Sequence, residues 1–409
     1  MGTVPTLDHL DFNDPSCLLD PYPMYARLRA RPEIIASPEL GWLVARHADV
    51  SAVLHDRRMA SGPLNAALYA GLPAEARAAI EPFQVSMSHN MLFQDAPEHT
   101  RLRRLVSQTF TPRRVQQLRE TIAEITRGLL VECGRGDSFD VIGGLAFPLP
   151  ARVIASMLGV PWEDLGQLKR WTDDGADFLG NARTTLTPVD LAARTGASYT
   201  ALMEYFRQQV ARHRAEPGDD LICDMLAIED GGQRLTEAEL LSTCGLLFSA
   251  GHETTTNLIG NGLLALLRHP DQLQALRDEP ALIPAAINEL TRYDCPVQFI
   301  YRVSLEPVEL GATTIPAGQL LTLLLGAANR DPQAFPDPDR LDVRRAPRHH
   351  VSFGTGAHAC LGGFLARLEA AIALEQLLAL APGLRLSDEP LAWHPNPIFR
   401  GLERLLVIL

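Results

Sequence analysis

Apolar residues recur at intervals of three and four along most of this chain, which is the period of an amphipathic helix. The stretches "PYPMYARLRA", "RRVQQLRETIAEITRGLLVECG" and "ASYTALMEYFRQQVARHRAEP" show this period. Stretches typical of strands are few and short, namely "GWLVAR", "EPVELGATTIPAGQLLTLLL" and "LERLLVIL". The pattern therefore predicts a mainly α-helical protein with a minor β region.

One predicted helix differs from the others because it is apolar nearly all round, which is typical of a helix buried in the core. It begins at Thr236, which has the spacing of a capping box with Glu239, and it ends at His269. Its middle, "AGHETTTN", carries Glu253 and several hydroxyl groups. Such groups are costly to bury without partners, so they indicate either a functional groove beside Gly251 or a kinked core helix whose polar side chains satisfy one another.

The composition of the 409 residues narrows the function classes. Because the sequence has no internal repeat or flexible linker, residues 1–409 are expected to form a single domain. The formal net charge of −12 argues against nucleic-acid binding. The six cysteines show no CxxC pair or zinc-ligand spacing, and the N-terminal residues show neither a basic leader nor an apolar anchor. We expect a cytoplasmic protein with no membrane anchor.

The stretch "FGTGAHACLGG", residues 353–363, surrounds Cys360 with glycines. A nucleophilic cysteine would need a base, and His358 is close in sequence but does not necessarily face the thiol. A zinc ligand would need companions, and a buried structural cysteine would not need the glycines. A thiolate bound to haem iron fits better, because glycines let the backbone approach both the sulfur and a flat porphyrin.

"FGTGAHACLGG" resembles the haem-binding loop of the cytochrome P450 family. "AGHETT" resembles the oxygen-activating helix of that family, "NELTR" its Glu-x-x-Arg pair, and "AANRDPQAFPDPDRLDVRR" the stretch that precedes the cysteine loop. With "DAPEHTRLRRLVSQTFTPRR" and "PIFRGLERLLVIL", the resemblance extends from near residue 21 to the C-terminus. It implies the cytochrome P450 fold, a triangular prism in which haem b is buried between the long central helix and the cysteine loop, and it implies monooxygenase activity.

The resemblance also assigns roles to single residues. Cys360 is the expected thiolate ligand of the iron. Thr254 and Glu253 are the expected catalytic residues, Thr254 as the alcohol that positions water and Glu253 as the acid that relays protons, where many relatives carry Asp. His252 is expected to make a local hydrogen bond or to tune this relay. The remaining haem contacts are expected at His99, Arg103, Ala250, Arg302, Phe353, Gly354, His358 and Gly362.

The Glu-x-x-Arg pair consists of Glu289 and Arg292, which lie three residues apart and therefore on one helix face. The resemblance makes this pair structural, with a third partner expected at Arg340. We do not expect these residues to be catalytic.

The substrate is expected to be a hydrophobic small molecule, because most substrate-facing positions of the family fall on apolar residues here. A terpenoid, a carotenoid, a steroid, a fatty acid and a macrolide all fit this description. Residues 60–92 are expected to form a long loop that moves as the ligand enters. The expected substrate contacts are Leu246, Ser249, Val297, Gln298, Ile398 and Phe399, with Ala250 beside them.

Electrons are expected from a separate ferredoxin and an NAD(P)H-dependent ferredoxin reductase, because no flavin or iron–sulfur domain is recognised in the sequence. The arginines within 101–114 and 340–350 could form a basic patch for an acidic ferredoxin, or could face the haem and internal acids. The chain is expected to use O2 and to be a monomer. A peroxide-driven peroxygenase and a non-catalytic haem-binding or sensing protein are the alternatives.

Overall fold

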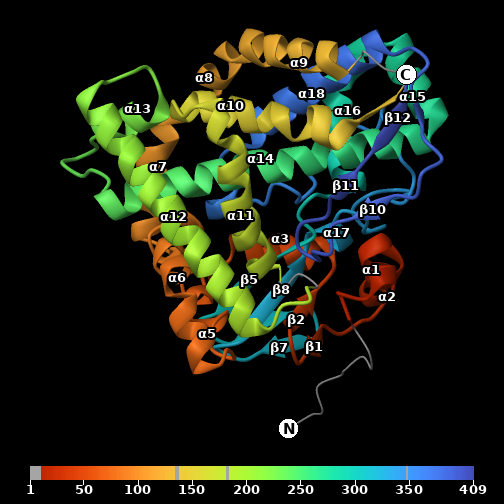
Figure 1. Cartoon of the computed structure of the whole chain (residues 1–409). Helices are drawn as coiled ribbons and strands as arrows, with labels where there is room; N and C mark the ends of the chain where they lie inside the picture. The colour runs from red at the N-terminus through yellow and green to blue at the C-terminus, as the bar shows by residue number, and fades with distance from the viewer. Residues whose placement is uncertain (1–10, 134–137, 181–183, 347–348) are drawn as a thin grey trace. The chain divides into compact units, whose positions relative to one another are not determined.

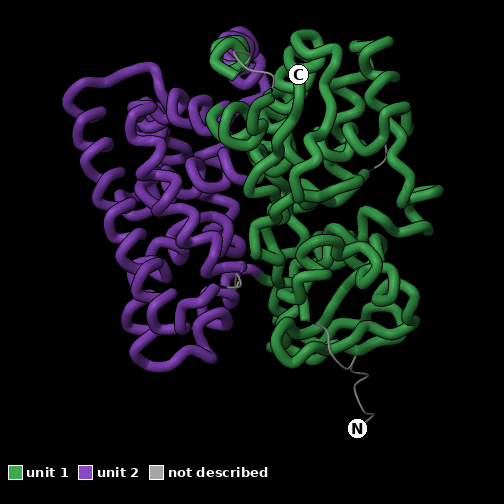
Figure 2. Tube along the Cα trace, turned by 45° about the vertical axis from the view of Figure 1, so that its right-hand side comes forward, with its two compact units in different colours: residues 1–60, 126–148, 254–409 green, residues 61–125, 149–253 purple. Residues whose placement is uncertain are grey.

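The computed structural model describes residues 11–133, 138–180, 184–346 and 349–409. Helices form most of it and the sheets are small, as the periodicity predicts (Figure 1). The chain divides into two compact units, which Figure 2 shows in different colours: residues 1–60, 126–148 and 254–409 form unit 1, and residues 61–125 and 149–253 form unit 2. The chain passes from one unit to the other at four points, so neither unit is one continuous segment. The single domain expected over residues 1–409 stays a prediction.

The elements that lie wholly in unit 2 are helices: α4 (Leu64–Ala67), α5 (Ala74–Ala79), α6 (Glu81–Ser88), η1 (Met91–Phe93), α7 (Glu98–Thr109), α8 (Pro112–Gln117), η3 (Trp162–Asp164), α11 (Leu165–Leu179), α12 (Pro188–Ala215) and α13 (Leu221–Ala227). The longest of these, α12, packs against α11 (Figure 1). Its N-terminus is capped by Thr187, whose hydroxyl accepts a hydrogen bond from the N–H of Asp190 at 3.1 Å. Three further helices, α9 (Arg119–Cys133), α10 (Pro148–Leu158) and α14 (Glu237–Arg268), each contain a boundary between the units.

The prediction of a long loop over residues 60–92 is wrong. Helices α4, α5, α6 and η1 occupy much of this segment, and α5 and α6 pack against α12. Helix α12 lies so close to the end of α5 that a Cβ atom on Gly196 of α12 would be 1.9 Å from the carbonyl oxygen of Ala79. Only glycine fits at this position. Ile80 and Phe83 are fully buried, and burial of these side chains holds the short helices in place.

Unit 1 contains the described strands and the remaining helices. The helices are α1 (Pro15–Leu19), α2 (Tyr22–Arg29), α3 (His47–His55), η2 (Ile142–Ala146), α15 (Pro270–Asp278), η4 (Pro280–Leu282), α16 (Ile283–Tyr293), α17 (Leu325–Ala328), η5 (Gly356–His358) and α18 (Gly363–Leu380). The strands are β1 (Ile35–Ser37), β2 (Gly41–Val44), β3 (Met59–Ala60), β4 (Ser138–Asp140), β5 (Phe299–Ser304), β6 (Val308–Leu310), β7 (Thr313–Ile315), β8 (Leu320–Leu324), β9 (Arg385–Leu386), β10 (Ala392–Trp393), β11 (Leu402–Arg404) and β12 (Leu406–Ile408).

The largest sheet has the strand order β1-β2-β8-β5-β3, in which β2 and β8 are parallel and the other pairs are antiparallel. Its two faces build two hydrophobic clusters, because successive side chains of a strand point to opposite sides. Trp42 and Val44 join one cluster, whereas Leu43 between them joins the other with Tyr25 and Phe299. The second cluster packs the sheet against α2.

Helix α14 matches its prediction within one residue at each end. The capping box is present, since the N–H of Thr236 donates to Glu239 Oε2 at 2.8 Å and the N–H of Glu239 donates to Thr236 Oγ1 at 3.3 Å. The helix continues without interruption through Gly251. A Cβ atom on Gly251 would lie 3.1 Å from Ile154 of α10, so this glycine allows close packing of the two helices.

Candidate active site

The cysteine loop connects the segment after α17 to the start of α18. Gly354 and Gly356 adopt positive φ angles of 61° and 71°, which other residues rarely adopt. Gly356 also lies against α3, where a Cβ atom would be 2.5 Å from the carbonyl oxygen of Leu54. The loop is closed by a hydrogen bond of 2.7 Å from the N–H of Cys360 to the carbonyl oxygen of Phe353. These constraints hold Cys360 in one place at the N-terminal side of α18.

Cys360 is the exposed cysteine among the six, and the other five are buried or half-buried. Burial raises the pKa of those five thiols, to about 12 for Cys295, so they disfavour the thiolate. A Cβ atom on Gly362 would meet nothing within 4 Å, so the backbone two residues after the thiol borders open space. An accessible thiol next to open space fits a planar group that is held through the sulfur.

A positively charged side chain, that of Arg367, contacts the cysteine loop at Phe353 and Gly363. It was not identified from the sequence. The guanidinium of Arg367 lies 3.9 Å from the ring centroid of Phe353. Arg367 also donates to Asn288 Oδ1 at 2.9 Å and to the carbonyl oxygen of Gly363 at 2.9 Å. Burial lowers the pKa of Arg367, and the negative charge of a Cys360 thiolate opposes this shift. Arg367 therefore orients Phe353 and favours the thiolate form of Cys360.

The predicted functional residues of α14 lie on one accessible face of an otherwise buried helix. Ala250 is exposed, and its predicted neighbours keep part of their surface, whereas Phe248 and His252 are buried. Spacings of three and four residues place these accessible positions on the same side of the helix. They are Leu246, Ser249, Ala250, Glu253 and Thr254.

Glu253 has the electrostatic environment of a neutral acid. Burial and the nearby carboxylate of Asp173 together raise its pKa to about 8, and Lys169 acts in the opposite direction. Asp173 and Lys169 form an ion pair of 2.5 Å on α11. Glu253 is therefore protonated at neutral pH and able to donate a proton.

His252 is neutral in the same environment, because burial lowers its pKa to about 4. Its Nδ1 lies 2.7 Å from the carbonyl oxygen of Phe248 and donates to it when it carries the proton. The local hydrogen bond, the simpler of the two roles expected for His252, is present.

The expected contacts of the haem propionates fall in both units. His99 is buried on α7 and Arg103 follows one turn later. In unit 1, Arg302 is buried on β5 and donates to the carbonyl oxygen of Tyr301 at 2.7 Å, and His358 ends η5. Cationic or hydrogen-bonding groups are thus present at all four positions, and their role toward the propionates stays a prediction.

Two of the predicted substrate segments are paired through their backbones. Val297 and Phe399 form an antiparallel bridge, and the N–H of Gln298 donates to the carbonyl oxygen of Ile398 at 2.8 Å. Val297 and Phe399 keep accessible surface, whereas Gln298 and Ile398 are buried. Side chains alternate along an extended backbone, so the pairing directs Gln298 and Ile398 away from the accessible side.

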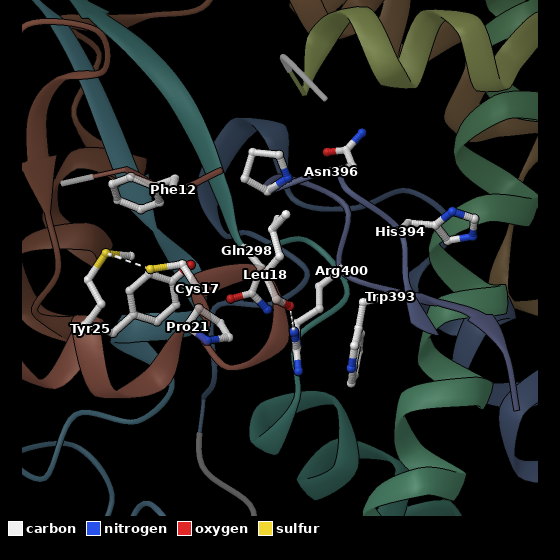
Figure 3. A pocket seen from close by; sticks show the side chains of 12 residues that line it. Phe12, Cys17, Leu18, Pro21, Tyr25, Gln298, Trp393, His394, Asn396 and Arg400 are labelled. Atoms are coloured by element: carbon white, nitrogen blue, oxygen red, sulfur yellow. Dashed lines mark hydrogen bonds between the residues drawn. The ribbon is translucent and has the colours of Figure 1, made fainter. Parts of the chain in front are cut away.

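Gln298 and Ile398 therefore serve the core. The side-chain amide of Gln298 donates to the carbonyl oxygen of Cys295 at 2.5 Å and lines a pocket with Tyr25 and Arg400 (Figure 3). Ile398 packs in the hydrophobic cluster that contains Tyr25. Val297 and Phe399 also pack against this cluster but keep part of their surface accessible, and their contact with a substrate stays a prediction.

The prediction that Arg340 completes the Glu-x-x-Arg group is wrong. Glu289 accepts two hydrogen bonds from Arg292, at 2.7 and 2.8 Å, and a third from Arg345 Nε at 3.0 Å. Arg340 contributes its backbone carbonyl oxygen, which accepts from Arg345 Nη2 at 2.9 Å. The buried group is thus an acid between two arginines, and its role is structural because it binds α16 to the segment after Asp337.

The expected basic patch is largely neutralised within each unit. Most of the arginines in question pair with acids of the chain, which was the alternative interpretation. Arg113 is exposed and forms no ion pair with the residues that the structure describes, and Arg348 lies outside those residues. The ion pairs are Arg101 with Glu98 and Glu239, Arg104 with Asp230, Arg114 with Asp224, and Arg344 with Glu279.

An accessible cysteine on a glycine-rich loop, a helix face with an acid and an alcohol, and a buried Glu-x-x-Arg group are all features expected of a haem-thiolate protein. The family model for cytochrome P450 matches residues 194–380. Cytochrome P450 107B1 of Saccharopolyspora erythraea is 41% identical, over 99% of this chain and 98% of the relative. Vitamin D(3) 25-hydroxylase of Pseudonocardia autotrophica is 40% identical, over 95% of this chain and 94% of the relative. The chain belongs to the cytochrome P450 family.

A solved structure supports the same assignment. The complex of P450BioI with an acyl carrier protein ligated to hexadec-9Z-enoic acid is matched with a TM-score of 0.88 at 38% identity, over 97% of this chain and 100% of that chain. The protein is therefore a cytochrome P450 monooxygenase with the cytochrome P450 fold, and its cofactor is haem b, which the family binds through a cysteine thiolate. In the part of the chain that the structure describes, we find no helix that is both long and apolar enough to cross a membrane.

Proposed function

We propose that this protein inserts one oxygen atom from O2 into a hydrophobic small molecule, with Cys360 as the thiolate ligand of the haem. The accessible position of Cys360 on the constrained loop carries this proposal, because the other five cysteines are less exposed and have raised thiol pKa values. When bound, haem supplies the iron at which O2 is activated. Gly354 and Gly362 give the haem room, and Phe353 packs beside the sulfur.

The chain's own residues supply the remaining chemistry. Glu253 holds a proton at neutral pH and passes it along the accessible face of α14. Thr254, the next residue, donates and accepts hydrogen bonds through its hydroxyl and thereby positions the water that carries this proton. His99, Arg103, Arg302 and His358 bind the propionates, and Ala250 contacts the porphyrin.

The substrate we propose is a large apolar molecule, such as a terpenoid, a carotenoid, a steroid, a fatty acid or a macrolide. Leu246, Val297 and Phe399 are apolar and keep accessible surface, and Ser249 offers one hydroxyl beside them. The names of relatives support this class, since one hydroxylates vitamin D(3) and another structure holds a hexadecenoic acid chain on its carrier protein.

We propose a ferredoxin and an NAD(P)H-dependent ferredoxin reductase as the electron donors, and a cytoplasmic monomer as the working form. Arg113 is a suitable contact for an acidic ferredoxin because it is exposed and not already paired with an acid in the described structure. Phe364 adds an apolar contact four residues after Cys360, since 64% of its surface is exposed at the start of α18.

The experiment that tests this function combines a substrate screen with turnover. Purified protein is titrated with fatty acids, steroids and macrolides, and each ligand that changes the haem absorbance is incubated with ferredoxin, reductase, NADPH and O2. We expect NADPH consumption to depend on the ligand and to yield a product heavier by one oxygen atom. Oxidation with hydrogen peroxide alone at an equal or higher rate would instead indicate a peroxygenase.

A further inference from the structure

Arg400 joins three segments of unit 1 that are far apart in the sequence. Its Nε donates to Asp294 Oδ1 at 2.9 Å, just after α16. Its two terminal nitrogens donate to the carbonyl oxygens of Leu18 and Leu19 at 2.7 and 3.0 Å, at the end of α1. Its guanidinium also lies 3.6 Å from the ring centroid of Trp393. Figure 3 shows Arg400 between Leu18 and Trp393, which line the same pocket.

These contacts explain why an arginine stands at this position. Only 7% of the side chain is exposed, so the buried charge needs an acid and carbonyl oxygens around it. The last carbonyl oxygens of a helix have no partner within the helix, and a cation is favourable at that end. Arg400 provides hydrogen-bond donors for two of these carbonyl oxygens and places a positive charge at the C-terminal end of α1. Asp294 balances the charge of Arg400. Tyr22 Oη donates to the same oxygen of Asp294 at 2.9 Å, which fixes the acid.

The backbone of Arg400 is held as firmly as its side chain. Its N–H donates to the carbonyl oxygen of Pro296 at 2.8 Å, and its carbonyl oxygen accepts from Asn261 Nδ2 at 2.9 Å. Asn396 Oδ1 accepts from the N–H of Phe399 at 3.1 Å and so shapes the turn before Arg400. Phe399, which keeps accessible surface, is therefore located by the residue that follows it.

We propose that Arg400 is a positioning residue that fixes Phe399 and its bridge partner Val297, and that α1 takes part in substrate selection through Arg400. This inference rests on the proposed function, in which Val297 and Phe399 contact the substrate. Without the guanidinium, the turn loses its connections to α1 and Asp294 and keeps only its backbone hydrogen bonds and those from Asn396 and Asn261. The side chain of Phe399 then samples several positions. Large ligands are then bound more weakly, whereas a ligand that is too small to reach Phe399 is bound as before.

Spectral titration with two haem ligands tests this proposal. Imidazole binds the iron and is small, and 4-phenylimidazole carries a ring that reaches further from the iron. For Arg400→Gln we expect the dissociation constant of 4-phenylimidazole to rise about tenfold and that of imidazole to change by less than about twofold. Arg400→Lys keeps a cation beside Asp294 and is expected to recover part of the lost affinity.

Two further variants complete the test. Arg46→Gln is the matched control, because Arg46 also donates to carbonyl oxygens at the end of a helix, those of Arg29 and Arg31, but does not contact the turn. It is expected to leave both dissociation constants unchanged. If Arg400→Gln does not fold, Asp294→Asn is used in its place, because it removes the acid partner of Arg400 and keeps the arginine. Weaker binding of 4-phenylimidazole, with unchanged binding of imidazole, is expected for this variant as well.

Equal weakening of both ligands, or unchanged binding of 4-phenylimidazole in a folded variant that carries haem, would overturn the positioning role. An unmodified protein that gives no absorbance change with imidazole would instead contradict the proposed haem function. The two failures are thus distinguishable.

Discussion

The guanidinium of Arg367 stacks on the ring of Phe353 at 3.9 Å, directly behind the loop that carries Cys360. Replacing Arg367 with Met removes a positive charge near the thiolate and keeps much of the apolar stem. Because a nearby cation favours the reduced state of a redox centre, the reduction potential of the haem is expected to fall by roughly 60 mV, which corresponds to about 1.4 kcal/mol for one electron. A redox titration followed by absorbance measures this shift. Arg367→Lys keeps the charge and serves as the control; an equal fall in both variants would show that the charge is not the cause.

The pKa of Glu253 predicts how stability and turnover depend on pH. The folded-state pKa is raised from 4.5 to about 8, so the unfolded chain releases its proton first. The stability that this group contributes at low pH is therefore lost as the pH rises from about 4.5 through about 8. Glu253→Gln cannot ionise, so its melting temperature relative to the unmodified protein is expected to be higher at pH 9 than at pH 5. Calorimetry at the two pH values checks this, and a constant difference between the proteins would contradict it.

The same residue is expected to control proton supply during turnover. Glu253→Gln removes a general acid, for which losses of about 100-fold or more are typical. In the unmodified protein, kcat is expected to decrease above pH 8 as Glu253 ionises. The rate of product formation from pH 6 to 9.5 is the measurement, and Glu253→Asp is the control because it keeps the carboxyl group. A pH profile of the unmodified protein that is flat across this range would rule out Glu253 as the proton donor.

The contacts of Glu289 predict different effects for two nearby arginines. Arg345→Ala leaves the buried carboxylate with one cation instead of two and removes one hydrogen bond to it. A hydrogen bond to a charged group typically contributes about 1.5–3 kcal/mol, and a loss of this size is expected. Arg340→Ala should cost little, because Arg340 contributes only its backbone carbonyl oxygen to this group. Denaturant unfolding of the two variants compares their free energies. A larger loss for Arg340→Ala would show that the ion pair has been assigned to the wrong residue.

The Arg340 error shows what the sequence could and could not predict. The capping box of Thr236 and Glu239 depends on residues three apart, so spacing alone predicted it, and the structure confirms it. The partner of Glu289 comes from more than fifty residues away, where the irregular path of the chain decides which arginine reaches the acid.

The substrate segments show the same limit. The pairing of Val297 with Phe399 determines that these two residues, and not their neighbours Gln298 and Ile398, face the accessible side. The local sequence pattern does not reveal this pairing. Arg367 and Arg400 were missed for a related reason, because their function depends on contacts that only the folded chain provides. Local motifs therefore predicted the class of site, and tertiary contacts determined its supporting residues.

The exposed ring of Phe364 predicts a contact with the electron donor. Phe364→Ala is expected to lower ferredoxin-driven turnover about tenfold, since aromatic residues, Phe among them, are enriched in the cores of protein–protein interfaces. The matched control is Leu380→Ala at the other end of α18, where 53% of the side chain is exposed. Stopped-flow measurement of haem reduction by ferredoxin, with chemical reduction by dithionite as a reference, separates docking from damage to the haem site. Equal rates for the two variants would exclude Phe364 from the interface.

The central claim is that Cys360 binds the haem iron as a thiolate. The most direct test is the absorbance of the dithionite-reduced protein with and without carbon monoxide, measured for the unmodified chain and for Cys360→Ser. We expect the unmodified protein to give a Soret band shifted far to the red, as thiolate-ligated haem does, and the variant to lose that band. A band typical of histidine-ligated haem in the unmodified protein, or a red-shifted band that persists in Cys360→Ser, would contradict the assignment of Cys360.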